Sequence, residues 1–144
     1  TTYGLFAGGR AGSSQSNVID RVTIGTSGNA SDFGDLTLSR QNIAATQDDT
    51  RAVFFAGYAG SYKNTIDYAT ISTAGNATDF GDCLAVYQSM ACGDGTKACH
   101  LGGTDGSLKN SIEYVTVQTT GNASDFGDLT RAARHGSATS GASS

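Results

Sequence analysis

An eight-residue motif that occurs three times is the feature that most constrains the fold of this chain. Its copies span Gly28–Asp35, Gly75–Asp82 and Gly121–Asp128, and each reads Gly-Asn-Ala-Ser/Thr-Asp-Phe-Gly-Asp. They start at residues 28, 75 and 121, so they lie 47 and then 46 residues apart. A fixed period of this size is typical of repeat proteins, whose units pack together because none can bury its apolar face alone. The sequence therefore predicts three packed units of similar structure.

The segments around each motif predict β-strands. Residues 17–24, 64–71 and 110–117 alternate apolar with polar positions, as a strand with two different faces does. An apolar run that ends in small residues precedes each of them, and a further segment of small residues follows each motif. The chain has 20 Gly and no Pro, so turns are abundant and every strand position can donate to a ladder. Each unit is expected to hold four short strands.

Four-stranded antiparallel sheets that repeat about every 40 to 50 residues are the blades of a β-propeller. We therefore expect one all-β domain over residues 1–144, with repeats at about 1–46, 47–92 and 93–139. Propellers typically have about four to eight blades, so three cannot close a ring alone. The C-terminal strand at 132–139 is expected to complete a blade with the N-terminal strand at 3–9. The missing blades would come from another copy, in a six-bladed dimer or a head-to-tail filament, or from further sequence of the same polypeptide.

The units resemble the kelch repeat, whose blade has a Gly-Gly doublet, then an apolar-acidic-aromatic triplet, then an aromatic residue that begins the outer strand. The doublet lies at 8–9 and 102–103, with Ala56-Gly57 in the middle unit, and the triplet at 66–68 and 112–114, with a looser match at 19–21. The outer aromatic residue is Phe33, Phe80 and Phe126, where many kelch repeats have Trp. The repeated residues are also similar to those of kelch-like arrays in structural proteins of tailed bacteriophages and in bacterial surface proteins. This resemblance implies a structural or adhesive role in a virion or an extracellular assembly.

The Asn of the motif has three interpretations, at Asn29, Asn76 and Asn122. It can form part of a turn, since Asn and Asp side chains bond nearby backbone amides. It can accept an N-linked glycan, because each copy is an Asn-x-Ser/Thr triplet without Pro. Asn29, Asp32 and Asp35 could also supply oxygens to Ca²⁺, although one short loop offers few ligands and lacks EF-hand spacing. The turn is the preferred interpretation, because a repeated turn creates all three triplets without further assumptions.

The cysteines and histidines are expected to serve packing. Cys92 and Cys99 flank the turn at 93–98, so they could form a disulfide across a hairpin, but reduced cysteines in the core are the preferred interpretation. Cys83 stands where the other units have Leu, and His100 where the middle unit has Phe54. With His100 alone near the three cysteines, packing is favoured over a zinc site, and no metal or cofactor is expected.

Charge and motifs exclude several function classes. The net charge is −4, and the nine Lys and Arg are scattered, so no basic face is expected to bind nucleic acid. No run of 18 apolar residues predicts a membrane-spanning helix, and the common nucleophile, metal and phosphate-loop motifs of enzymes are missing. Arg40 is expected near a unit boundary, where it could pair with an Asp of the motif.

Two functions fit these observations. The first is a non-enzymatic structural or adhesive module, virion-associated or extracellular, whose partners are copies of itself or further blades. The alternative is a lectin-like propeller that binds surface glycans through its rim loops, with Tyr58 and Tyr62 stacking on sugar rings. The other two units lack both tyrosines, so such a site would not repeat.

Overall fold

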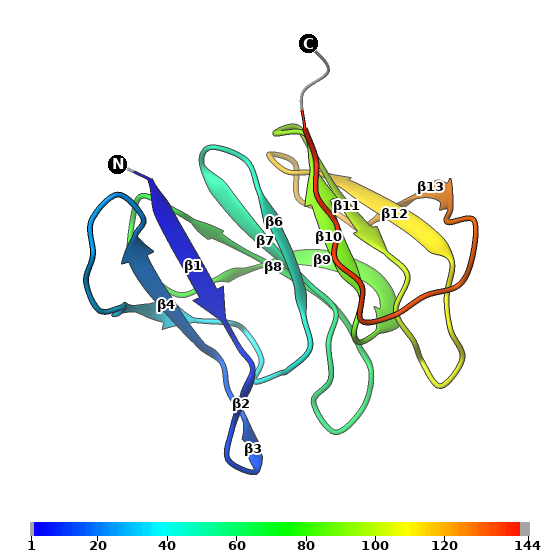
Figure 1. Cartoon of the computed structure of the whole chain (residues 1–144), viewed down its shortest axis with the longest axis horizontal. Helices are drawn as coiled ribbons and strands as arrows, with labels where there is room; N and C mark the ends of the chain where they lie inside the picture. Colours follow the sequence, from blue (N-terminus) through cyan, green and yellow to red (C-terminus); the bar gives the residue numbers. More distant parts are fainter. Residues whose placement is uncertain (1, 142–144) are drawn as a thin grey trace.

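The computed structural model describes residues 2–141, whose regular structure consists of β-strands without a helix (Figure 1). No helix long and apolar enough to cross a membrane occurs in this range. The strands are β1 (Tyr3–Ala7), β2 (Arg10–Ala11), β3 (Ser14–Gln15), β4 (Val18–Thr23), β5 (Ser31–Asp35), β6 (Ala44–Gln47), β7 (Arg51–Phe55), β8 (Lys63–Thr70), β9 (Thr78–Val86), β10 (Met90–Gly93), β11 (Lys97–Leu101), β12 (Ser111–Thr116) and β13 (Ser124–Asp128).

These strands form four antiparallel sheets, which confirms the all-β prediction. The N-terminal sheet has the order β1-β4-β5, the middle sheet β6-β7-β8-β9 and the C-terminal sheet β10-β11-β12-β13, while β2 and β3 form a small hairpin. The three large sheets lie side by side in chain order (Figure 1). The middle and C-terminal sheets have the four strands expected of a unit, and the N-terminal sheet lacks the strand that corresponds to β6 and β10.

The repeated motif has the same place in each large sheet. Its last five residues form the outer strands β5 and β13 and the first part of β9. The pairing register shifts opposite the Phe-Gly of every copy, between Ile19 and Asp20, between Ile66 and Asp67, and between Ile112 and Glu113. An irregularity at one position in all three sheets is expected when the sheets are copies of one unit.

The core lies between the sheets. One cluster, with Ile19, Phe33 and Phe54, fills the junction between the N-terminal and middle sheets, called the first junction here. A second cluster, with Phe55 and Val115, fills the junction between the middle and C-terminal sheets, called the second junction. Phe54 and Phe55 are neighbours in β7 and enter different clusters, because successive side chains of a strand point to opposite faces. The middle sheet is therefore covered on both faces, and each flanking sheet on one.

The C-terminal segment lies along β10 (Figure 1). The amide of Gly103 donates to the carbonyl of Ala133 at 2.8 Å, the amide of His135 donates to Gln88 at 3.0 Å, and the hydroxyl of Ser140 donates to the carbonyl of Gly93. Among the described residues this segment forms no hydrogen bond with β1, and it is not itself a regular strand. The expected pairing of 132–139 with 3–9 is therefore not made within one chain, and it stays a prediction for the β1 strand of another copy.

Candidate functional site

Each repeated motif is hydrogen-bonded to the motif before it, across the junction between two sheets. At the first junction the amides of Gly75 and Ala77 donate to the carbonyls of Phe33 and Asp35, both at 2.7 Å. The side-chain oxygen Oδ1 of Asn76 accepts the amide of Asp35 at 3.1 Å. The beginning of one motif thus binds the end of the preceding one.

The second junction repeats this pattern. The amides of Gly121 and Ala123 donate to the carbonyls of Phe80 and Asp82, both at 2.8 Å, and Asn122 accepts the amide of Asp82 at 3.0 Å. The amides that Asn76 and Asn122 bind lie 41 and 40 residues away, so these side chains connect two sheets instead of capping a local turn. The turn interpretation of the motif was therefore incomplete. Glycosylation of Asn29, Asn76 and Asn122 stays a prediction, and so does Ca²⁺ binding by Asn29, Asp32 and Asp35.

Two glycines of the motif permit the close approach of the sheets. A Cβ atom on Gly34 would overlap the carbonyl oxygen of Gly75, and one on Gly81 would overlap that of Gly121. Both glycines also have φ near +150°, which L-residues rarely adopt. Gly127 is the third equivalent, with φ of +139°, yet no described atom lies within 4 Å of its Cβ position. The surface beside Gly127 is therefore open where the other two motifs are covered.

A buried acidic residue lies deeper in the first junction. Asp67 accepts the amide of Thr37 at 3.2 Å and its hydroxyl at 2.6 Å, and forms an ion pair with Arg40 at 3.1 Å. Arg40 also donates to the carbonyls of Phe54 and Thr65. Both charged side chains are fully buried, and burial lowers the pKa of Arg40, which the charge of Asp67 opposes. Arg40 lies at a boundary as expected, but the expectation that its partner would be an Asp of the motif was wrong.

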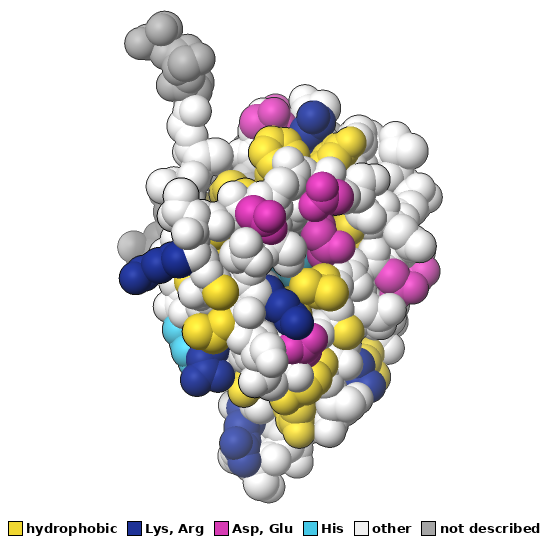
Figure 2. Space-filling view, turned by 90° about the vertical axis from the view of Figure 1, so that its right-hand side faces the viewer, with side chains coloured by type: hydrophobic (Ala, Val, Ile, Leu, Met, Phe, Trp, Pro, Cys, Tyr) yellow, Lys and Arg dark blue, Asp and Glu magenta, His cyan; other side chains and the backbone are white. Residues whose placement is uncertain are grey.

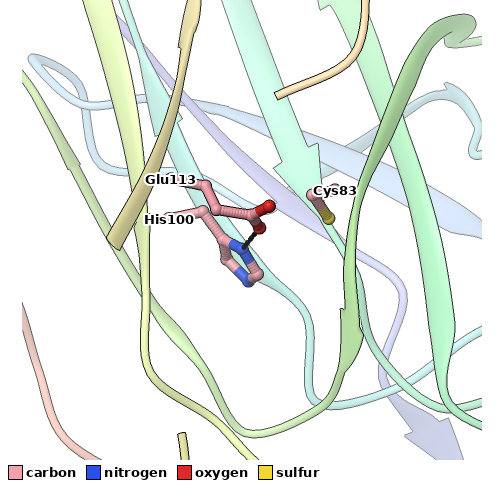
Figure 3. A group of neighbouring side chains, drawn as sticks. All are labelled: Cys83, His100 and Glu113. Atoms are coloured by element: carbon pink, nitrogen blue, oxygen red, sulfur yellow. Dashed lines mark hydrogen bonds and ion pairs between the residues drawn. The ribbon is translucent and has the colours of Figure 1, made fainter. Parts of the chain in front are cut away.

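The equivalent place in the second junction holds a different group: Cys83, His100 and Glu113 (Figure 3). Glu113 accepts the amide of Leu84 at 2.7 Å, as Asp67 accepts Thr37, and its Oε2 lies 3.5 Å from Nδ1 of His100. His100 is buried and stacks on Phe55 with ring centroids 5.2 Å apart, and its Nε2 has no hydrogen-bond partner among the described residues.

Burial and hydrogen bonding set the ionisation of this group. Burial raises the pKa of the Cys83 thiol to about 12, and the thiol donates to the carbonyl of Asn64 at 3.3 Å. Burial alone would raise the pKa of Glu113, but the contacts with His100 and the Leu84 amide outweigh it and lower that pKa. Sequence reasoning placed Cys83 and His100 in the core and missed Glu113. A signal existed, since Cys83 and His100, from two neighbouring units, stand where the other units have Leu and Phe.

The other predicted site residues lie elsewhere. Cys92 and Cys99 are directly opposed in the β10–β11 ladder and are both free thiols, each partly exposed and not buried in the core. Tyr58 and Tyr62 contact each other edge to face, with ring centroids 5.9 Å apart. Tyr87, which sequence reasoning did not include, stacks on Tyr62 at 5.4 Å. Two tyrosines of the loop after β7 thus form a cluster with Tyr87, which follows β9.

The two outer faces expose side chains that are buried at both internal junctions. On the N-terminal sheet, Phe6 is 61% exposed, and its equivalent Phe54 only 2%. Ile24 is 64% exposed, and its equivalent Val117 only 1%. On the C-terminal sheet, Phe126 is 55% exposed, whereas Phe33 and Phe80 are buried. Figure 2 shows the outer side of the C-terminal sheet, where hydrophobic patches reach the surface between acidic and basic groups.

Comparison of the chain with protein-family models found no match, and comparison with curated proteins found no similar sequence. Its function is therefore inferred from the geometry of the sheets and from the differences among its three units.

Proposed function

We propose that this chain is a three-blade segment of a kelch-like β-propeller and serves as a non-enzymatic structural or adhesive module that assembles with copies of itself. The observation that carries the proposal is the exposure of Phe6, Ile24 and Phe126, whose equivalents are buried wherever one sheet meets the next. Burying one such side chain contributes about 1.5 to 3 kcal/mol. A location in a virion or an extracellular assembly is supported by the resemblance of the repeats alone.

The repeated motif supports a specific way of docking. In the N-terminal motif, Gly28, Asn29 and Ala30 have no preceding motif to bind within the described residues. In the C-terminal motif, the carbonyls of Phe126 and Asp128 have no following motif within the same range. By analogy with the internal junctions, the amides of Gly28 and Ala30 of one copy would donate to the carbonyls of Phe126 and Asp128 of the preceding copy, and Asn29 would accept the amide of that Asp128. The open surface beside Gly127 would receive Gly28, as that beside Gly81 receives Gly121.

The C-terminal segment supports the same docking. β6 pairs with β7 so that Ala45 lies opposite Phe54. Residues 137–140 are the equivalents of β6, and they lie beside β10 without a strand on their other side in the described chain. In the docked arrangement they would pair with β1 of the next copy, placing Ala138 opposite Phe6. Such a head-to-tail contact joins different surfaces, so it closes a ring where the rotation allows and otherwise continues as a filament.

The test is the mass of the particle in solution, measured by light scattering after size exclusion. The chain has a mass of 14.6 kDa, and we expect twice this mass for a two-copy ring or a larger mass for a filament. Ile24→Asp should give monomers, because it places a charge in the expected interface. Ser72→Asp is the control, since it adds the same charge at an exposed position in the turn after β8 of the middle sheet. A wild-type chain that stays monomeric at high concentration would contradict self-assembly.

The register can be tested by crosslinking. In a chain in which the three native cysteines are replaced, Phe6→Cys with Ala138→Cys should form an intermolecular disulfide on oxidation, since the two positions would be paired. Phe6→Cys with Ser13→Cys is the control, because Ser13 lies in the exposed turn between β2 and β3. Equal crosslinking of both pairs would exclude the proposed register.

A glycan-binding role is the second candidate. Two observations favour it. The cluster of Tyr58, Tyr62 and Tyr87 has Tyr62 partly exposed, and a surface hollow recurs beside all three motifs. Each hollow is lined by threonines together with the Gly-Asn of its motif, which supplies hydroxyl and amide groups for a sugar. Binding on a glycan array that Tyr62→Ala or Thr73→Val weakens would support it. If the protein binds no glycan on the array, the glycan-binding role is excluded.

A further inference from the structure

We propose that the second junction binds a zinc-class divalent metal ion through Cys83, His100 and Glu113. The three residues come from both sheets of the junction: Cys83 from β9, His100 from β11 and Glu113 from β12 (Figure 3). Their ligand atoms all lie within 4.8 Å of one another, and no other such group of His, Cys, Asp and Glu occurs among residues 2–141. The bond lengths of tetrahedral zinc place ligand atoms about 3.3 to 3.8 Å apart, so small side-chain rotations suffice.

The comparison of the three units gives the strongest reason. Cys83 stands where the other units have Leu36 and Leu129, and His100 stands where they have Phe6 and Phe54. Leu36 and Phe54 fill the first junction by apolar packing alone, so packing does not require Cys or His at these positions. Two residues that bind metals have thus replaced two apolar residues at the same place.

A third difference concerns charge. At the first junction Arg40 neutralises the buried Asp67. Val86 takes the place of Arg40 in the second junction. The carbonyl oxygen of Arg40 accepts the amide of Gly9, and the carbonyl oxygen of Val86 accepts the amide of Gly57, which is the equivalent glycine. Glu113 therefore has no arginine partner among the described residues. A divalent ion bound by one carboxylate, one thiolate and a neutral imidazole would form a site without net charge, which would offset the cost of partly burying the Glu113 carboxylate.

The hydrogen bonding of the group leaves room for a ligand. The buried Nε2 of His100 has no partner among the described residues, which is unusual for a polar atom in a core. The Cys83 thiol donates its proton in a hydrogen bond to the Asn64 carbonyl. Metal binding would release this proton to solvent, because the sulfur binds the metal as a thiolate. The mixture of sulfur, nitrogen and oxygen ligands suits zinc better than Ca²⁺ or Mg²⁺, which prefer oxygen alone. Three protein ligands leave a fourth position for water or a backbone carbonyl.

The site lies within one chain, so it is independent of self-assembly and can be tested in the monomeric Ile24→Asp variant. Cys92→Ser and Cys99→Ser should be added to remove the other thiols. Titration of the metal-free protein with Co²⁺ should then produce the absorption of a cobalt–thiolate bond, saturating at one ion per chain. Zn²⁺ should displace Co²⁺ and raise the melting temperature, because it binds the folded chain.

The decisive variants are Cys83→Leu and His100→Phe, which restore the residues of the other units and should leave the fold intact. Each should weaken Zn²⁺ binding at least about tenfold, and Cys83→Leu should abolish the cobalt–thiolate absorption. Leu36→Cys is the control, since it adds a thiol to the first junction, where Phe54 stands in place of the histidine. The proposal fails if the parent chain does not bind Zn²⁺ stoichiometrically, or if the two variants bind it as tightly as the parent.

Discussion

The largest fully buried side chain among the described residues is that of Arg40, in the first junction. Its guanidinium binds the Asp67 carboxylate and two backbone carbonyls, so its charge and most of its donors are satisfied. Burying such a pair has a large desolvation cost, which the attraction between the partners only roughly offsets. Removing one partner is worse, because the other charge then stays buried alone.

Arg40→Met should accordingly lower the free energy of unfolding by about 3 to 5 kcal/mol, measured by urea denaturation. The double variant Arg40→Met with Asp67→Asn should cost less than Arg40→Met alone, because it leaves no unpaired charge and the new side-chain amide oxygen can still accept from Thr37. Arg10→Met, at an exposed position, should change stability by no more than about 0.5 kcal/mol. A double variant that is less stable than Arg40→Met would show that the charge of Asp67 is not the cause.

At the scale of the element, the repeated motif combines a strand with an inter-sheet contact. Its first three residues bind the preceding motif, and its last three bind the following one. The middle motif uses both halves, while each outer motif uses one half within the described chain. A sequence that makes this contact must keep Gly where the two backbones meet, which explains Gly34 and Gly81.

Gly81→Ala and Gly127→Ala separate this contact from backbone strain. Both positions have φ near +140°, so Ala imposes a similar conformational cost at each. At Gly81 the new Cβ also meets the carbonyl of Gly121, which should make this variant less stable than Gly127→Ala by about 1 to 3 kcal/mol. The two variants should be compared by chemical denaturation in the Ile24→Asp background. Equal losses of unfolding free energy in the two variants would mean that the inter-sheet contact at Gly81 does not contribute to stability.

At the scale of the whole molecule, burial is uneven. The middle sheet has apolar clusters on both faces, whereas the N-terminal and C-terminal sheets have one covered face each. The N-terminal sheet also lacks, in the described chain, the strand that corresponds to β6 and β10. Stability should therefore be highest in the middle sheet and lowest at the N-terminal one, where the fewest contacts hold the backbone.

Docking of a second copy would supply the missing contacts, so the melting temperature should rise with protein concentration. Ile24→Asp should melt at a lower temperature that does not change with dilution. Amide hydrogen exchange of β1 in the wild-type chain should slow as concentration rises, because residues 137–140 of another copy would pair with it. A melting temperature independent of concentration in both proteins would contradict the docking model.

Much of the fold follows from local sequence patterns. The alternation at 64–71, together with the turn residues that follow it, predicted the strand that the structure shows as β8, because side-chain direction and turn conformation depend on neighbouring residues. The recurrence of the motif likewise predicted copies of one unit. The pattern did not predict that Asn76 reaches Asp35, because that bond joins residues 41 positions apart.

The sequence by itself determined the all-β class, the number of repeats and the position of most strands, since these depend on interactions between near neighbours and on repetition. Only the tertiary structure decided which residues meet across the junctions. It paired Arg40 with Asp67, gathered Cys83, His100 and Glu113 from two sheets, and left Phe6 and Phe126 on opposite outer faces. These outcomes depend on the distance and rotation between whole sheets, which no local pattern encodes.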